Sequence, residues 1–230
     1  MNGEAIISFI LAHLSRIGEF CAVVVVAFNH RYIKRTFMKW TLPFLSIVLC
    51  AEIASFFCTF PNDYKLNNQI NDIVGCAESL FYTYLFHHFT ASEKFQKFTI
   101  AVAFISCLLY VIDFLFGSVN TNFLVISIIT SGILMTIISC WYMLIMFTED
   151  NKGRLISEPG FWISIGVTSF FAGCSIVFCL HDYIVSHDLK FLNIRLYRFV
   201  PRVLSLVLYS CISIAVILCQ KKTKISLQRS

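Results

Sequence analysis

The feature that most constrains this chain is a series of seven apolar segments, each about as long as a bilayer is thick. A helix of about 20 mostly apolar residues crosses a membrane with all of its backbone hydrogen bonds satisfied internally. We therefore predict an all-α polytopic membrane protein, a bundle of seven transmembrane helices that forms one domain over residues 1–230. The predicted spans are 5–28, 38–60, 69–89, 98–117, 122–147, 161–184 and 199–219.

The composition supports this prediction and excludes other classes. The chain is 58% hydrophobic and 13% charged, which is about half the charge of a soluble globular domain. Its 9 glycines and 4 prolines are too few for a collagen-like or disordered chain. All 10 cysteines lie within the apolar runs and none forms a CxxC pair, so we expect small buried hydrophobic residues and no disulfide scaffold.

The distribution of lysine and arginine predicts the orientation of the helices. With seven spans, one set of connections carries twelve of these residues and the other set carries four, namely Lys65, Lys190, Arg195 and Arg198. Positive charge accumulates in cytoplasmic connections. The N-terminus is therefore predicted outside and the C-terminus in the cytoplasm, and a bacterial inner membrane is the expected location.

Ionisable residues inside spans are costly in a membrane and are candidate functional residues by default. Helix rise places Arg16, Glu52 and Glu78 within about one turn of a common depth, and we expect them at the floor of a polar pocket that opens outward. Glu19 lies on a small-residue stripe of the first span, with Ala5, Ser8, Ala12, Ser15 and Ala22, and this stripe is expected to face the bundle. The expected rim of the pocket consists of Asp72, Asp113, His181 and Arg202.

Three interpretations of these buried charges remain open. They could form ion pairs that only hold the helices in register, they could bind a ligand or ion from outside, or they could lie on a conducting path. A cluster of His181, Asp182, His187 and Asp188 near the outer end of the sixth span has residue types that bind zinc, but a solvated loop explains it better. We therefore predict no metal site and no cofactor.

Missing residues argue against several familiar classes. The seventh span has no lysine for a retinal Schiff base, so no retinal is expected, and the receptor signatures Asp-Arg-Tyr and Asn-Pro-x-x-Tyr are absent. The Pro-Gln dipeptides of seven-helix sugar transporters are absent too. Because no serine-hydrolase, zincin or phosphate-loop motif is present, we expect no enzyme. The basic tail, residues 220–230, is interpreted as a topology signal and lipid contact, with no nucleic-acid partner.

One segment suggests a family. The run from Leu155 to Gly166, LISEPGFWISIG, together with the stretch from Phe170 to Gly173, FFAG, resembles the start of the sixth helix in small uncharacterised seven-helix proteins of Bacteroidetes bacteria. The stretch from Glu78 to Tyr82, ESLFY, is similar to their third helix. The resemblance implies a sensory or signalling membrane component. Our leading hypothesis is thus a receptor-like or signal-relaying protein with a cytoplasmic signalling partner, and the alternative is a small ion- or proton-coupled transporter.

Overall fold

The computed structural model describes residues 13–34, 36–59, 64–116, 121–148, 155–191 and 194–229. Within these residues the chain forms eight α-helices, two short 3₁₀ helices and a two-residue antiparallel strand pair. The helices are α2 (Leu14–Ile33), α3 (Thr41–Thr59), α4 (Tyr64–Phe89), α5 (Glu93–Phe116), α6 (Thr121–Thr148), α7 (Pro159–Cys179), α8 (His181–Ser186) and α9 (Leu196–Arg229); the 3₁₀ helices are η1 (Phe37–Trp40) and η2 (Leu155–Ser157), and the strands are β1 (Lys190–Phe191) and β2 (Ile194–Arg195).

The seven long helices fall on the seven predicted ranges, and the all-α prediction is confirmed. Among the described residues, five of them are long and apolar enough to cross a membrane. These are α3 (which continues from η1), α5, α6, α7 and α9. The other two are more polar, since α2 contains Arg16, Glu19 and Arg31 and α4 contains Asp72 and Glu78. The chain is therefore an integral membrane protein with at least five helices suited to a bilayer.

The helix boundaries differ from the predicted ones where polar sequence continues a helix or backbone geometry interrupts it. Helix α4 begins at Tyr64 and α9 continues to Arg229, because a helix needs no apolar side chains once it leaves a bilayer. The predicted sixth range, 161–184, is divided: α7 ends at Cys179, and Leu180 adopts φ −93° and ψ 9° before α8 begins. Residues 5–12 of the first predicted span lie outside the described residues.

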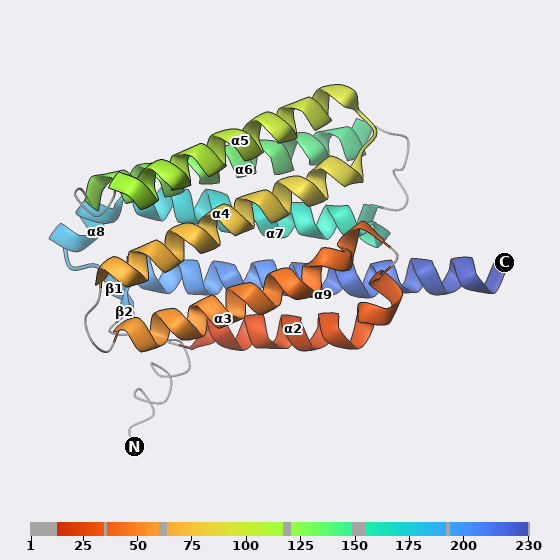
Figure 1. The fold of residues 1–230 in the computed structure, drawn as a ribbon, viewed down its shortest axis with the longest axis horizontal. Coiled ribbons are helices and arrows are strands. Elements are labelled where there is room, and N and C mark those ends of the chain that lie inside the picture. Colours follow the sequence, from red (N-terminus) through yellow and green to blue (C-terminus); the bar gives the residue numbers. More distant parts are fainter. Residues whose placement is uncertain are drawn as a thin grey trace, which may run out of the picture.

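The long helices lie side by side, with α4 and α7 between the α5–α6 pair and the group of α2, α3 and α9 (Figure 1). Helix α9 packs most extensively against α7 and α2. We call the end of the bundle with α8, β1 and β2 the hairpin end. The opposite end, with η1, η2 and the last turns of α9, is the tail end, beyond which α9 projects (Figure 1).

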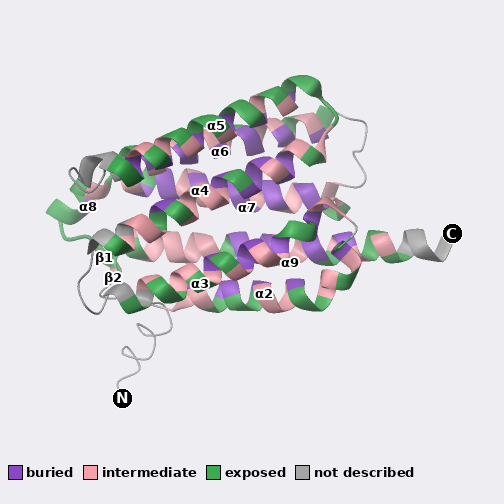
Figure 2. Ribbon diagram, viewed as in Figure 1, coloured by how far each residue is buried: buried purple, intermediate pink, exposed green. Residues whose placement is uncertain are grey.

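Burial follows the pattern of a bundle surrounded by an apolar medium. Tyr82, Phe86 and Phe95 are fully buried, whereas Phe104 and Leu144 are more than 60% exposed. Exposed positions follow the outer faces of the helices along their length, and buried positions face the interior (Figure 2). So many large exposed apolar side chains would be unfavourable in water and are accommodated by lipid.

Close contacts between α9 and its neighbours depend on glycine. A Cβ atom at Gly166 of α7 would lie 2.9 Å from Cys211 Cβ and 3.4 Å from the Leu208 Cα of α9, and one at Gly18 of α2 would lie 2.8 Å from Leu206 Cδ1. Ser15, Glu19 and Ala22, the described part of the predicted stripe, are all buried. Small residues thus let α2, α7 and α9 approach closely, as in other membrane bundles. The outcome agrees with the predicted face of the first span.

Candidate functional site

A polar cavity of about 130 Å³ lies inside the bundle, between α2, α3, α4, α7 and α9. Three carboxyl groups line it, each from a different helix: Glu19 from α2, Glu52 from α3 and Glu78 from α4. Its remaining wall is partly polar and partly apolar. The other lining residues are Val48, Ala51, Ser55, Ile70, Asn71, Val74, Phe170, Ser205 and Tyr209.

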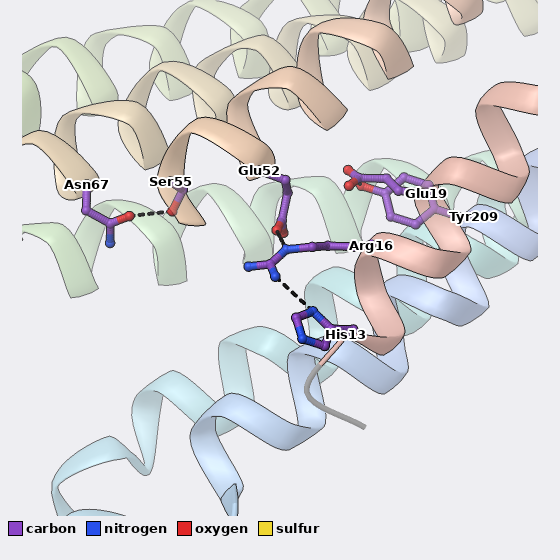
Figure 3. A network of polar contacts seen from close by, with 7 residues as sticks. All are labelled: His13, Arg16, Glu19, Glu52, Ser55, Asn67 and Tyr209. Atoms are coloured by element: carbon purple, nitrogen blue, oxygen red, sulfur yellow. Dashed lines mark hydrogen bonds and ion pairs between the residues drawn. The ribbon is translucent and has the colours of Figure 1, made fainter. Parts of the chain in front are cut away.

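An ion pair lies at one edge of this cavity. Arg16 Nε lies 3.4 Å from Glu52 Oε2, and the two side chains are 29% and 39% exposed. The guanidinium also donates from Nη1 to His13 Nδ1, 3.0 Å away (Figure 3). Arg16 is one turn from Glu19 on the same helix, on the side of the hairpin end. The pair therefore lies at the hairpin side of the cavity, and both of its side chains are partly exposed there.

Of the three carboxyl groups that line the cavity, that of Glu19 belongs to a buried residue, which is 1% exposed. Its Oε1 accepts a hydrogen bond of 2.7 Å from the Tyr209 hydroxyl of α9 (Figure 3). Its Oε2 has no hydrogen-bond partner. Two helices at opposite ends of the sequence are thus joined by a single buried polar contact inside the cavity.

The charges around the cavity do not balance. Glu19 and Glu78 interact electrostatically with Glu52 and with each other, and Arg16 is already paired with Glu52. Arg202 lies near Arg16 and Glu52, but it does not line the cavity. With all three carboxyl groups ionised, the lining would carry net negative charge in a medium that disfavours it. Protonation or a bound cation would relieve this.

Tightly packed side chains fill the bundle between the cavity and the tail end. Phe44 of α3 stacks on Phe81 of α4 with ring centroids 3.8 Å apart, and Tyr82 packs edge-on against Phe44 and Phe171. Tyr82 and Phe86 are 0% exposed. These aromatic residues occupy the turns that separate Glu78 from His87, so the packing closes the cavity on its tail side.

Two of the predicted rim residues form a separate group. Asp72 and Asp113 are both buried and interact electrostatically with each other, and Asp113 faces Ser127 of α6. Asp72 lines a different, apolar groove between α4 and α5, together with Cys76 and Tyr110. Neither aspartate reaches the cavity that contains Glu78.

A third predicted rim residue, His181, lies at the hairpin end and is partly exposed. Its Nδ1 is 3.2 Å from Asp182 Oδ1, and its ring packs against Tyr197. Asp188 instead pairs with Lys190 at 2.5 Å and Arg195 at 3.9 Å across the hairpin. The Lys190 hydrogen bond, helped by the charges of Lys190 and Arg195, holds the pKa of Asp188 below its ordinary value.

The predicted site residues therefore divide into three places. Glu19, Glu52 and Glu78 line one cavity, with Arg16 and Arg202 close to Glu52 at its edge. The comparison of depths along the helices had predicted that Arg16, Glu52 and Glu78 lie close together. Asp72 and Asp113 lie together elsewhere, and His181 lies at the surface of the hairpin end. In the part of the chain that the structure describes, no group of three His, Cys, Asp or Glu side chains is close enough to hold a metal ion.

The structure also adds residues that the sequence analysis did not select. Tyr209 and Ser205 of α9 and Asn71 of α4 line the cavity, and the Ser55 hydroxyl donates to Asn67 Oδ1 near its edge (Figure 3). A signal for α9 was present in the sequence, since Ser205 and Tyr209 are four residues apart and lie on one face of the helix.

Comparison with known proteins adds no relative: no protein family, curated protein or solved structure matches this chain.

Proposed function

We propose that this protein is a receptor-like, signal-relaying membrane component of seven transmembrane helices, with the hairpin end outside and the tail end in the cytoplasm. The observation that carries this proposal is the carboxyl-lined cavity, which an ion pair borders on the hairpin side and aromatic packing closes on the tail side. A cavity that is closed toward the tail end suits detection of an outside signal better than passage of an ion or solute through the bundle. We propose no catalytic activity.

The proposed orientation is supported by where basic residues lie in the fold. Of the twelve lysines and arginines in one set of predicted connections, Lys34, Lys39 and Lys222 are exposed at the tail end. Positive charge is favoured on the cytoplasmic side. The more polar helices α2 and α4 then cross the membrane with their charged side chains inside the bundle, where Glu19 and Glu78 lie.

Helix α9 is the proposed relay between the cavity and the cytoplasmic side. At the cavity, Tyr209 donates to Glu19. At the tail end, Lys222 Nζ is 2.6 Å from Glu158 Oε2 at the start of α7, and Lys224 Nζ is 4.7 Å from the Tyr32 ring of α2. The thirteen-residue step from Tyr209 to Lys222 spans about 20 Å of helix. A shift of α9 at the cavity would therefore displace contacts at a surface open to a cytoplasmic partner.

A small ion- or proton-coupled transporter remains the second candidate, because the same three carboxyl groups could carry a proton or cation. It requires a second conformation in which Phe44, Phe81 and Tyr82 separate and a path toward His87 opens. The packing of these rings is the specific observation that makes this candidate the weaker one.

Hydrogen–deuterium exchange on the protein in lipid nanodiscs tests the relay. The perturbation is Glu19→Gln, which removes charge from the cavity while keeping an acceptor for Tyr209. We expect altered exchange in the peptides that contain Glu158 and Lys222, because their contacts depend on the position of α9. The matched control is Asp182→Asn, which removes one exposed carboxyl group at the hairpin end.

An unchanged tail end in the cavity variant would contradict the relay, provided that its circular dichroism shows an intact helical fold. The same contradiction would follow if the control altered the tail-end peptides to the same extent.

A further inference from the structure

We infer that the cavity lined by Glu19, Glu52 and Glu78 binds a small primary ammonium compound, an alkylamine of a few carbon atoms in its protonated form. The inference deepens the proposed function and rests on it, since the ammonium compound would be the signal that is detected. It specifies the ligand class through three separate properties of the cavity: an unused acceptor, the arrangement of the charges, and the mixed chemistry of the walls.

The unused acceptor is Oε2 of Glu19. This side chain is 99% buried, its other oxygen accepts from Tyr209, and Oε2 has no hydrogen-bond partner. The carboxyl group projects from α2 toward Glu52 (Figure 3). A buried carboxylate oxygen without a donor is unfavourable by the full cost of its lost hydration. An ammonium group supplies three donors and a positive charge at once.

The arrangement of the charges argues for an organic cation and against a bare metal ion. The three carboxyl groups come from three helices, and no described group of three acidic, histidine or cysteine side chains converges closely enough for a metal. Calcium and magnesium require oxygen ligands within about 2.0–2.6 Å of one point. An ammonium group can bind Glu19 while Glu78 adds longer-range attraction, so it does not need convergent ligands.

The walls fit a short hydrocarbon chain. Val48, Val74 and Phe170 are apolar residues of the lining, and Tyr209 and Phe170 are its aromatic residues. Aromatic rings attract ammonium groups. The volume of about 130 Å³ holds several water molecules, and it is smaller than the pockets that enclose drug-sized ligands. A few carbon atoms and one nitrogen match this space.

Entry is expected at the edge formed by Arg16 and Glu52. Both side chains are partly exposed, and their contact is 3.4 Å long. An incoming ammonium group can exchange with the guanidinium at Glu52 before it reaches Glu19. The tail side offers no comparable route, because Phe81 and Tyr82 are packed and buried there.

Isothermal titration calorimetry on the purified protein in nanodiscs tests the inference, with propylammonium chloride as the probe at pH 7. We expect saturable binding to the wild type and at least tenfold weaker binding in Glu19→Gln and in Glu78→Gln. The control variant Asp182→Asn should bind as the wild type does. Propanol has similar size without charge, and sodium chloride has charge without a hydrocarbon chain; neither should bind saturably.

Absence of propylammonium binding to the folded wild type would overturn the inference. Sodium binding at the same site would also overturn it, in favour of a metal cation. Should Glu19→Gln fail to fold, Glu78→Gln alone decides, and unchanged affinity there places the binding elsewhere and overturns the inference as well.

The proposed function fails in a different way. Transport of radiolabelled propylammonium into proteoliposomes, with binding intact, would refute the receptor role and retain the site. If propylammonium does not bind but Glu19→Gln still alters hydrogen exchange at the tail end, the inferred ligand class is wrong and the proposed relay through α9 is supported.

Discussion

Replacing Tyr209 by phenylalanine should destabilise the protein by about 1.5 kcal/mol, because it removes the donor that Glu19 uses inside the bundle. The hydrogen bond is 2.7 Å long and buried at both ends. Hydrogen bonds to charged groups contribute about 1.5–3 kcal/mol and neutral ones about 0.5–1.5 kcal/mol. Between membrane helices the measured contributions average about 0.6 kcal/mol and reach about 1.7 kcal/mol. A buried carboxyl acceptor places this bond near the upper end of that range.

The assay is equilibrium unfolding of the protein in mixed micelles with sodium dodecyl sulfate, followed by circular dichroism. Tyr82→Phe is the matched control, because the Tyr82 hydroxyl is buried and has no hydrogen-bond partner. Its removal should leave the free energy of unfolding unchanged or raise it slightly. The double variant with Glu19→Gln completes a cycle, and we expect a coupling energy of about 1 kcal/mol between the two positions.

Equal changes in the free energy of unfolding for Tyr209→Phe and Tyr82→Phe would refute this prediction. Such a result would mean that the Tyr209 hydroxyl contributes nothing to the join between α2 and α9, and the relay through α9 would lose its starting contact.

Three further predictions concern other parts of the bundle. Gly166→Ala should cost about 2 kcal/mol by overpacking against α9, and an unfolding free energy equal to that of the wild type would contradict the close approach. The Sγ atoms of Cys76 and Cys107 are 3.5 Å apart, so mild oxidation with copper phenanthroline should join them in a disulfide. Mass spectrometry would then show two thiols protected from alkylation. Failure to form the disulfide would contradict this close contact between α4 and α5. Carbon-13 NMR should show that the pKa of the Asp188 carboxyl lies below the ordinary aspartate value of about 3.9. The contribution of this carboxylate to the stability of the hairpin is then present above about pH 3.9 and is lost as the pH falls through the lowered pKa. An unshifted pKa would contradict the Lys190 contact.

The positions of the long helices could be predicted because membrane-spanning helices require long apolar runs. Depth could be predicted as well, since a fixed rise per residue relates Arg16, Glu52 and Glu78 along the bundle axis. The depth of a residue in the bundle does not show toward which neighbouring helix its side chain points. Asp72 and Glu78 are six residues apart, which places them about 120° apart around α4, and the two carboxyl groups consequently face different neighbours.

Contacts between segments far apart in the sequence could not be predicted from the sequence alone. Tyr209 and Glu19 are 190 residues apart, and a tyrosine in an apolar run is common enough to attract no attention. The break at Leu180, which separates α7 from α8, was missed because the apolar residues Tyr183 and Ile184 follow His181 and Asp182 and extended the predicted span. Hydropathy describes which residues prefer lipid, and it contains no information on where a helix ends within an apolar stretch.

Measurement of ion flux distinguishes a cavity that detects a signal from one that conducts. The protein is reconstituted into liposomes, and proton, sodium and potassium fluxes are measured under imposed gradients for the wild type, Glu78→Gln and Arg16→Gln at matched amounts of folded protein. We predict that none of the three exceeds the flux of empty liposomes. A wild-type flux that Glu78→Gln abolishes would contradict the account and identify the protein as a carrier or channel whose path includes the cavity.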